Sequence, residues 1–367
     1  MRGIIFNGTR AEVVSGLEVR DPGPTEVRIR IMAAGVCHSD LSVVNGTIPW
    51  PSPAVLGHEG AGIVEEVGAA VRSVAPGDHV VVATLATCGH CKWCNSGHPT
   101  WCRSSMGNVT QPFTLHGEPC SNFAAASVFA EHTVISEAQA VRIDAEVPFT
   151  SACLIGCGVV TGVGAVLNRA RVAQGQTAAV FGVGGIGLNV IQACAMSGAA
   201  RIIAVDNVAS KEKLARQFGA SDFIDASQVD ATAVIREMLP FSPDVANGPF
   251  RASGVDWSFD CVGHPAVLRN ALDVLDWGGN CVIIGVPPPT AELTIPITYF
   301  THVDRGLMGC RYGSIRPHYD IPLIVDRYRA GQLKLDELVS KTYPLEDFEQ
   351  VVTDMEAGHL ARGVLTF

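Results

Sequence analysis

Hydrophobic and polar residues alternate in short runs over roughly the first 145 residues of the chain. Between Glu26 and Ile31 every second residue is a branched aliphatic, and the residues at positions 28 and 30 are arginines. This period of two is typical of a strand with one buried face. Turns rich in Gly and Pro at 21–24 and 76–78 precede this strand and the apolar run His79–Val82. The pattern predicts a compact, barrel-like β domain.

The pattern changes after about Thr150, where apolar runs begin to alternate with helix-compatible stretches. The expected strands are 178–181, 201–205, 257–259 and 280–286, and the expected helix after the first of them covers 188–196. Such alternation predicts a doubly wound parallel sheet of the α/β class. It fades after Pro287-Pro288-Pro289. Residues 241–254 contain two Pro and two Gly, and we expect them to form a surface insertion.

Composition narrows the class of protein further. A chain of 367 residues predicts two domains at roughly 150 residues each. The net charge of −10 argues against partners such as nucleic acid or an anionic membrane, which attract basic surfaces. The uncharged stretches 147–168 and 172–200 are interrupted by Gly and polar residues, so we expect buried αβ segments and no membrane span. The N-terminus lacks a signal-peptide pattern, which favours a cytoplasmic protein.

A glycine-rich turn follows the first predicted strand of the α/β region. It consists of Gly182, Val183, Gly184, Gly185, Ile186 and Gly187. Asp206 follows about 20 residues later, at the end of the next expected strand, which completes the context of a dinucleotide site. An acidic residue there accepts hydrogen bonds from a ribose 2′-hydroxyl and repels a 2′-phosphate, so the motif favours NAD over NADP. The alternative is a tight βα turn without a ligand.

Four cysteines, Cys88, Cys91, Cys94 and Cys102, lie within fifteen residues. Four thiolates suit one tetrahedral Zn²⁺ ion, and such a closed site is structural. The bacterial iron–sulfur pattern requires three residues before its last Cys and a Pro after it, but here there are seven and an Arg. Disulfides are disfavoured by a reducing compartment.

Three other segments carry candidate chemistry that spacing alone does not connect: 35–40 (GVCHSD), 57–62 (GHEGAG) and 156–158 (GCG). Together with the glycine-rich turn, the four-cysteine loop and the final segment 361–367 (ARGVLTF), they resemble the zinc-dependent medium-chain alcohol dehydrogenases over the whole chain. The resemblance implies a GroES-like β-barrel catalytic domain, formed by 1–158 and 312–367, and a Rossmann NAD-binding domain at 159–311. The active site is then expected between them.

The resemblance also implies roles for individual residues. The catalytic zinc ligands are Cys37, His58 and Cys157, an open Cys₂His set. Asp40 orients His58, and Glu59 is the acid beside the metal. The implied cofactor contacts are His38, Thr161, Lys211, Val262, Ile284, Val286, Arg362 and the backbone of 310–312, in addition to the glycine-rich turn and Asp206.

The same resemblance assigns the alcohol proton to Ser39, but the relay histidine three positions further on is replaced by Ser42. The implied substrate pocket consists of Ile48, Thr84, Phe123, Ala124 and Val286. Thr84 stands where a large aromatic residue is common, so we expect a hydrophobic alcohol larger than ethanol, unless nearby Trp50 refills the space. The small-molecule reactants are thus an alcohol and its aldehyde or ketone.

Other interpretations remain open. The stretch 35–41 also resembles formaldehyde dehydrogenases that act on glutathione or mycothiol adducts, although Ile48 replaces the acid of the glutathione branch. A non-catalytic NAD- and zinc-binding relative is a third hypothesis, and permanently bound NAD a fourth. The long segment after Cys102 resembles dimeric members, so we expect a homodimer.

These assignments account for six of the twelve cysteines and predict two zinc ions per chain, one structural and one catalytic. We expect most of the remaining six to be small buried hydrophobic residues: Cys120, Cys153, Cys194, Cys261, Cys281 and Cys310.

Overall fold

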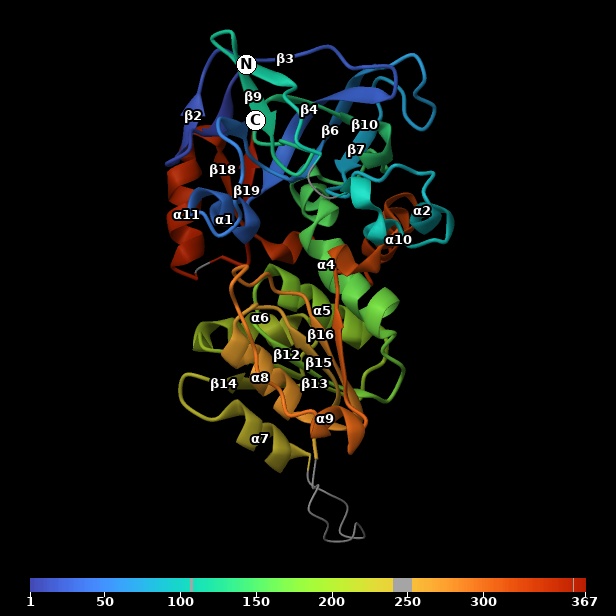
Figure 1. Ribbon diagram of the computed structural model, residues 1–367, viewed down its shortest axis with the longest axis vertical. Helices are drawn as coiled ribbons and strands as arrows, with labels where there is room; N and C mark the ends of the chain where they lie inside the picture. Colours follow the sequence, from blue (N-terminus) through green and yellow to red (C-terminus); the bar gives the residue numbers. More distant parts are fainter. Residues whose placement is uncertain (106–107, 240–252, 359) are drawn as a thin grey trace. The chain divides into compact units, whose positions relative to one another are not determined.

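The computed structural model describes residues 1–105, 108–239, 253–358 and 360–367. The chain forms two compact units, Met1–Val160 with Ile315–Phe367 and Thr161–Ser314. The first unit is rich in β-structure and the second alternates strands and helices (Figure 1), as the sequence pattern predicts. Residues 241–252 of the expected insertion lie outside the described residues.

The β-rich unit contains two sheets. The first has the order β2 (Ala11–Val14), β1 (Gly3–Phe6), β5 (Ala54–Val55), β9 (Glu118–Asn122), β8 (Phe113–Leu115) and β3 (Leu17–Val19). The second has the order β11 (Ala140–Arg142), β7 (His79–Val82), β6 (Glu59–Val67), β4 (Glu26–Gly35), β19 (Arg362–Thr366) and β18 (Val339–Pro344), with β10 (His132–Ser136) paired to β4. Helices α1 (His38–Val44), α2 (Lys92–Asn95), α3 (Phe149–Ala152), α10 (Pro317–Arg329) and α11 (Phe348–Glu356) belong to this unit.

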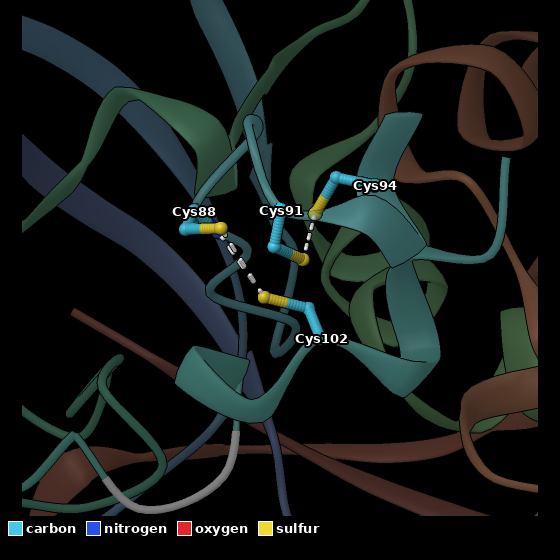
Figure 2. A group of neighbouring side chains, drawn as sticks. All are labelled: Cys88, Cys91, Cys94 and Cys102. Carbon is cyan, nitrogen blue, oxygen red and sulfur yellow. Dashed lines mark hydrogen bonds between the residues drawn. The ribbon is translucent and has the colours of Figure 1, made fainter. Parts of the chain in front are cut away.

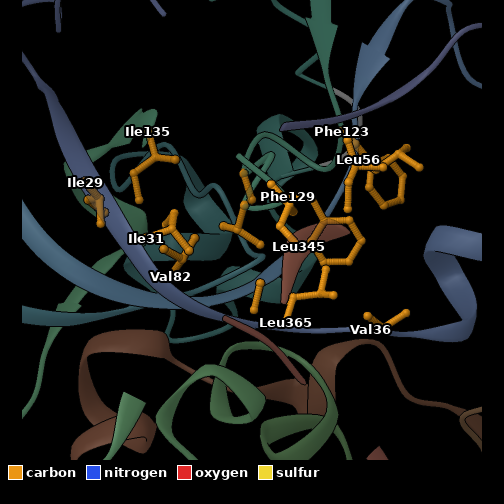
Figure 3. Close-up of a cluster of buried hydrophobic side chains, with 14 of the residues drawn as sticks. Ile29, Ile31, Val36, Leu56, Val82, Phe123, Phe129, Ile135, Leu345 and Leu365 are labelled. Atoms are coloured by element: carbon orange, nitrogen blue, oxygen red, sulfur yellow. The ribbon is translucent and has the colours of Figure 1, made fainter. Parts of the chain in front are cut away.

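The core of this unit joins the two ends of the chain. Ile29 and Ile31 of β4 are buried, as the period-two pattern predicts, and they belong to one apolar cluster with Leu345 and Leu365 (Figure 3). Antiparallel pairing of β19 with β4 places Val364 opposite Gly35. Because β6 pairs with the other edge of β4, Gly35 lies between the beginnings of β6 and β19. The site described below lies at this end of β4.

The second unit contains a parallel sheet with the order β14 (Asp222–Asp225), β13 (Arg201–Asp206), β12 (Thr177–Phe181), β15 (Val255–Asp260), β16 (Leu275–Ile283) and β17 (Gly306–Gly309). This is the 3-2-1-4-5-6 order of doubly wound dinucleotide-binding sheets. Its helices are α5 (Gly185–Met196), α6 (Glu212–Gln217), α7 (Ala231–Met238), α8 (Pro265–Asp273) and α9 (Thr298–Thr301). Helix α4 (Gly158–Gly164) contains the boundary between the units.

Among the described residues, no single helix is long and apolar enough to cross a membrane. The helical segments Phe149–Gly156 and Gly158–Ala170 meet the length and hydropathy criteria only when taken together, and they are bent by 57°.

Candidate active site

Three potential metal ligands and one carboxylate converge inside the β-rich unit. Cys37 caps the beginning of α1, His58 precedes β6, and Cys157 follows the short helical turn Cys153–Gly156. Their ligand atoms and one carboxylate oxygen of Glu59 all lie within 4.8 Å of one another, and all four residues are buried. Two thiols and an imidazole at such distances match the donor set of an open zinc site.

Asp40 fixes the orientation of the His58 ring. Its Oδ1 accepts hydrogen bonds from Nδ1 of His58 at 3.0 Å and from the amide of Gly57 at 3.2 Å, and its Oδ2 accepts from the amide of Cys37 at 3.1 Å. Asp40 thus ties together the segments that carry two of the ligands. Nε2 of His58 is buried and has no hydrogen-bond partner among the described residues. A metal ion at this nitrogen would satisfy an atom that is otherwise costly to bury.

Electrostatics favour the charged forms of His58 and Cys37, whereas the hydrogen bond with Cys37 and burial raise the pKa of Cys157 well above its usual value. Burial alone would lower the pKa of His58, but the charge and hydrogen bond of Asp40, together with Cys37, raise it to about 10. The pKa of Cys37 lies well below its usual value because Cys157 donates a hydrogen bond to its sulfur and because His58 and Arg362 supply positive charge. A divalent cation would stabilise the same thiolate and take the place of the imidazolium proton.

Glu59 is held by an arginine from the far end of the chain. Its Oε2 accepts a hydrogen bond from Nη2 of Arg362, and both side chains are buried. A Cβ on Gly35 would come within 2.5 Å of that same oxygen, so only glycine leaves room for the contact. The other oxygen, Oε1, is buried without a hydrogen-bond partner in the described part of the chain. Glu59 therefore has one oxygen neutralised and one available to the metal group.

The four-cysteine loop forms a second group of potential ligands (Figure 2). The sulfurs of Cys88, Cys91, Cys94 and Cys102 lie within 4.8 Å of one another, and all four cysteines are free. The Cys88–Cys102 and Cys91–Cys94 sulfur pairs are each 3.6 Å apart. Four sulfurs with this convergence fit a closed tetrahedral zinc ion.

The glycine-rich turn in the second unit connects β12 to α5. Gly182 has φ of +91°, a conformation that favours glycine, and a side chain on Gly187 would collide with the carbonyl oxygen of Gly182. A Cβ on Gly184 would point into open space. Gly184 precedes the first residue of α5, so the helix N-terminus and its N–H groups face the turn, as anion binding requires.

Asp206, at the end of β13, is anchored beside that turn. Its carboxylate accepts hydrogen bonds from the amides of Val183 at 2.7 Å and Val208 at 3.0 Å, and Nζ of Lys211 lies 3.0 Å from Oδ2. The structure thus places the Asp206 carboxylate and the Lys211 ammonium in direct contact at the end of β13.

The other predicted residues have varied environments. His38 is exposed, Ser39 and Ser42 are half-buried one turn apart on α1, and Thr161 is buried. In the second unit, Ile284 is buried, whereas Val262 and Val286 are 47% and 66% exposed. Gly185 and Ile186 form the first turn of α5. Of the six remaining cysteines, Cys261 and Cys310 are half-buried and the others are buried.

The expected substrate-pocket residues of the β-rich unit pack around an aromatic group. The Phe123 ring lies edge-on to His58, with centroids 5.5 Å apart, and edge-on to Trp50 at 5.1 Å. Ile48, Trp50 and Ala124 pack against the same cluster as Phe123. Thr84 is buried, and its hydroxyl lies within hydrogen-bond distance of the backbone carbonyls of His58 and Gly156.

The pairing of Glu59 with Arg362 was not expected from sequence. The two residues are 303 positions apart, and no local pattern links them. The hydrogen bonds of Thr84 were not expected either, since a lone threonine after an apolar run carries no signal of its partners.

Comparisons with known proteins agree with this geometry. Residues 23–145 match the alcohol dehydrogenase GroES-like domain, and residues 185–328 match the zinc-binding dehydrogenase family. The chain belongs to the zinc-dependent medium-chain alcohol dehydrogenases, and it is an oxidoreductase of a family that uses zinc and NAD.

Individual relatives cover nearly the whole chain. It is 37% identical to class-3 alcohol dehydrogenase of Cereibacter sphaeroides, over 96% of each chain, and 36% identical to S-(hydroxymethyl)glutathione dehydrogenase of Saccharomyces cerevisiae, over 99% of this chain and 95% of the relative. The crystal structure of benzyl alcohol dehydrogenase from Acinetobacter calcoaceticus superposes with a TM-score of 0.91 at 30% identity, covering 100% of this chain and 99% of that one. The predicted family and fold class are confirmed.

Proposed function

We propose that the chain interconverts a hydrophobic alcohol larger than ethanol and its aldehyde or ketone, with NAD as the hydride carrier. The observation that carries the proposal is the buried convergence of Cys37, His58 and Cys157, with Nε2 of His58 left without a partner among the described residues and Nδ1 held by Asp40. These three residues would hold a catalytic zinc ion, and the four-cysteine loop a structural one.

When bound, zinc supplies a Lewis acid that lowers the pKa of an alcohol, and NAD supplies the hydride acceptor. The residues of the chain orient the reactants and move the proton. Asp40 keeps Nε2 of His58 directed at the metal group through its hydrogen bond to Nδ1. Oγ of Ser39 would accept the alcohol proton, and Ser42, one turn further along α1, is the next hydroxyl that can carry it outward.

Recognition of the adenine ribose of NAD is assigned to the second unit. The anchored carboxylate of Asp206 and the ammonium of Lys211 would both contact the adenine ribose, while the N-terminus of α5 would receive the pyrophosphate. We further assign His38 and Arg362 to the pyrophosphate, and Thr161, Val262, Ile284 and Val286 to the nicotinamide. These roles rest on the resemblance.

The proposed substrate class is supported by the apolar surroundings of His58. The aromatic rings of Phe123 and Trp50, together with Ile48 and Ala124, give this part of the unit an apolar, partly aromatic character. The similarity to benzyl alcohol dehydrogenase also favours an aromatic or long aliphatic alcohol.

The test is a panel of primary alcohols, from ethanol to octanol and benzyl alcohol, assayed with NAD on protein whose zinc content is known. We expect kcat/KM to rise with apolar size and zinc content to be about two ions per chain. The highest kcat/KM on ethanol would refute the substrate class, and failure to oxidise any alcohol would refute the reaction.

A second candidate is the oxidation of a formaldehyde–thiol adduct, which the similarity to S-(hydroxymethyl)glutathione dehydrogenase favours. The apolar Ile48, where the glutathione branch carries an acid, weighs against glutathione itself. The same assay with formaldehyde, with and without glutathione or mycothiol, separates the two. Activity that requires the thiol would support the adduct reaction.

We also propose a homodimer, which light scattering on the purified protein tests. A mass near 77 kDa, about twice the 38.7 kDa of one chain, is the expected result.

A further inference from the structure

Thr84 lies just beyond the end of β7, and its side chain is 2% exposed. Its hydroxyl oxygen lies 2.9 Å from the carbonyl oxygen of His58 and 3.2 Å from the carbonyl oxygen of Gly156. Its amide also donates to the carbonyl of Gly156, at 3.3 Å. A hydroxyl has one proton, so the most favourable arrangement is hydroxyl to His58 and amide to Gly156.

These two carbonyls belong to the segments that carry two of the three proposed zinc ligands. One carbonyl is that of His58 itself, and the other directly precedes Cys157. The two ligands are far apart in sequence, and no hydrogen bond between their side chains is found in the described structure. Thr84 therefore bridges two segments whose separation sets the distance between an imidazole and a thiolate.

The position of Thr84 is itself fixed from the other side. The amide of Ala83 donates to the carbonyl of Gln139 at 2.8 Å, and Nε2 of Gln139 donates to the carbonyl of Ala83 at 3.1 Å. Gln139 is 1% exposed. A side chain on Gly156 would collide with the carbonyl oxygen of Val82, so glycine permits this close approach of the turn to β7. The bridge is thus part of a packed, hydrogen-bonded frame with little freedom to adjust.

We propose that Thr84 is a positioning residue for the catalytic metal site, holding the His58 and Cys157 segments at the spacing that zinc requires. The proposal rests on the proposed function, since it assumes zinc at Cys37, His58 and Cys157. It differs from the role that the family resemblance implies, in which residue 84 shapes the substrate pocket. The hydroxyl acts through the backbone carbonyls of the two ligand segments and through a side-chain hydrogen bond with Cys157, and it does not touch the reacting atoms.

The chemistry of the hydroxyl gives matched variants. Thr84→Val keeps the shape of the side chain and removes the donor, so the buried carbonyl of His58 loses its partner. Thr84→Ser keeps the donor. Thr133→Val is the control: Thr133 is buried in the same unit, and its hydroxyl donates to the carbonyl of Ala126 at 2.6 Å, far in sequence from any proposed zinc ligand.

The experiment measures zinc affinity by chelator competition on the full-length holoenzyme, and the absorption spectrum after exchange of zinc for cobalt. Residues that support metal ligands typically contribute about 10- to 100-fold in affinity. We expect Thr84→Val to weaken zinc binding at the Cys37–His58–Cys157 site by about 10-fold or more and to shift the cobalt–thiolate bands. Thr84→Ser and Thr133→Val should both retain the wild-type affinity and spectrum. If Thr84→Val does not fold, Thr84→Ala is predicted to show the same loss.

Two results would overturn the proposal. One is a wild-type affinity and cobalt spectrum in Thr84→Val, and the other is an equal loss of affinity in Thr133→Val. A wild-type protein that binds no zinc at Cys37, His58 and Cys157 would instead contradict the proposed function. The two failures are thereby distinguished before any activity is measured.

Discussion

Oδ1 of Asp40 accepts hydrogen bonds from the imidazole of His58 and from the amide of Gly57, while Oδ2 accepts one from the amide of Cys37. One buried carboxylate thus sets the direction of one ligand and the backbone position of another. Its contribution to metal binding should therefore be larger than that of any single hydrogen bond.

Asp40→Asn tests this arrangement with almost no change in shape. The amide can keep the hydrogen bonds accepted by one of the two oxygens but loses the charge and the other acceptor oxygen. We expect about a 10- to 100-fold loss in zinc affinity at the Cys37–His58–Cys157 site and a comparable loss of activity, measured by chelator competition and steady-state assay. Asp78→Asn is the control, because Asp78 also accepts a backbone amide, that of Ala75 at 2.9 Å, in a turn outside the site. Equal losses in the two variants would contradict the orienting role.

Removal of one ligand from the four-cysteine loop should release the structural zinc ion and leave the catalytic one bound. Cys94→Ser is expected to leave about one zinc ion per chain, lower the melting temperature and increase proteolysis within 88–102, because a closed tetrahedral zinc ion contributes directly to folding. Elemental analysis and calorimetry measure both effects. The control Cys120→Ala removes a buried thiol that is not a proposed ligand and should keep about two zinc ions. Two ions retained in Cys94→Ser would exclude the loop as a zinc site.

The buried ion pair between Glu59 and Arg362 predicts that substitutions at these two residues have strongly non-additive effects on the free energy of unfolding. Arg362→Met leaves a buried carboxylate without its cation, and breaking such a pair costs about 3–5 kcal/mol. Glu59→Gln combined with Arg362→Met removes both charges and should be less destabilised than the sum of the single variants. A double-mutant cycle by urea unfolding measures the coupling, with zinc content determined for each variant. Additive effects would show that the two charges do not stabilise one another in the folded protein.

Asp206→Asn tests the predicted choice of NAD. The loss of charge weakens the hydrogen bonds to the ribose, so kcat/KM with NAD should fall about 10- to 100-fold. It also removes the repulsion of a 2′-phosphate, so the preference for NAD over NADP should narrow. Asp225→Asn is the matched control, since Asp225 ends the adjacent strand β14 directly opposite Asp206. A cofactor preference unchanged in Asp206→Asn, or changed equally in Asp225→Asn, would contradict the assignment.

Local patterns predicted much of the fold and missed what depends on distant partners. The alternation at Glu26–Ile31 located β4, and the apolar run before the glycine-rich turn located β12. Strand β16 begins at Leu275, five residues before the expected start at 280, because Asp276 and two glycines interrupt its apolar pattern. Strand β17 was missed because it holds two apolar residues between glycines and forms by pairing with β16.

In the site too, local motifs were predictable from the sequence and contacts between distant segments were not. The two cysteine-containing groups of potential ligands were expected at the positions where they converge, one from spacing and the other from family resemblance. The partners of Thr84 and the pairing of Glu59 with Arg362 could not be predicted, because each depends on backbone segments that meet only through the sheet and the turns packed on it.

The contact between Glu59 and Arg362 also has a consequence for the timing of synthesis. At about 5–20 residues per second, the 303 positions between them are translated in roughly 15–60 s. Throughout that interval the nascent chain contains Cys37, His58 and Glu59, and Cys157 is added part of the way through it. Strand β19, which carries Arg362, has not yet been made. The buried carboxylate therefore gains its cation only after the whole second unit has been translated. Until then β4 lacks β19, the strand that pairs with it at Ala33, Ala34 and Gly35 in the complete fold.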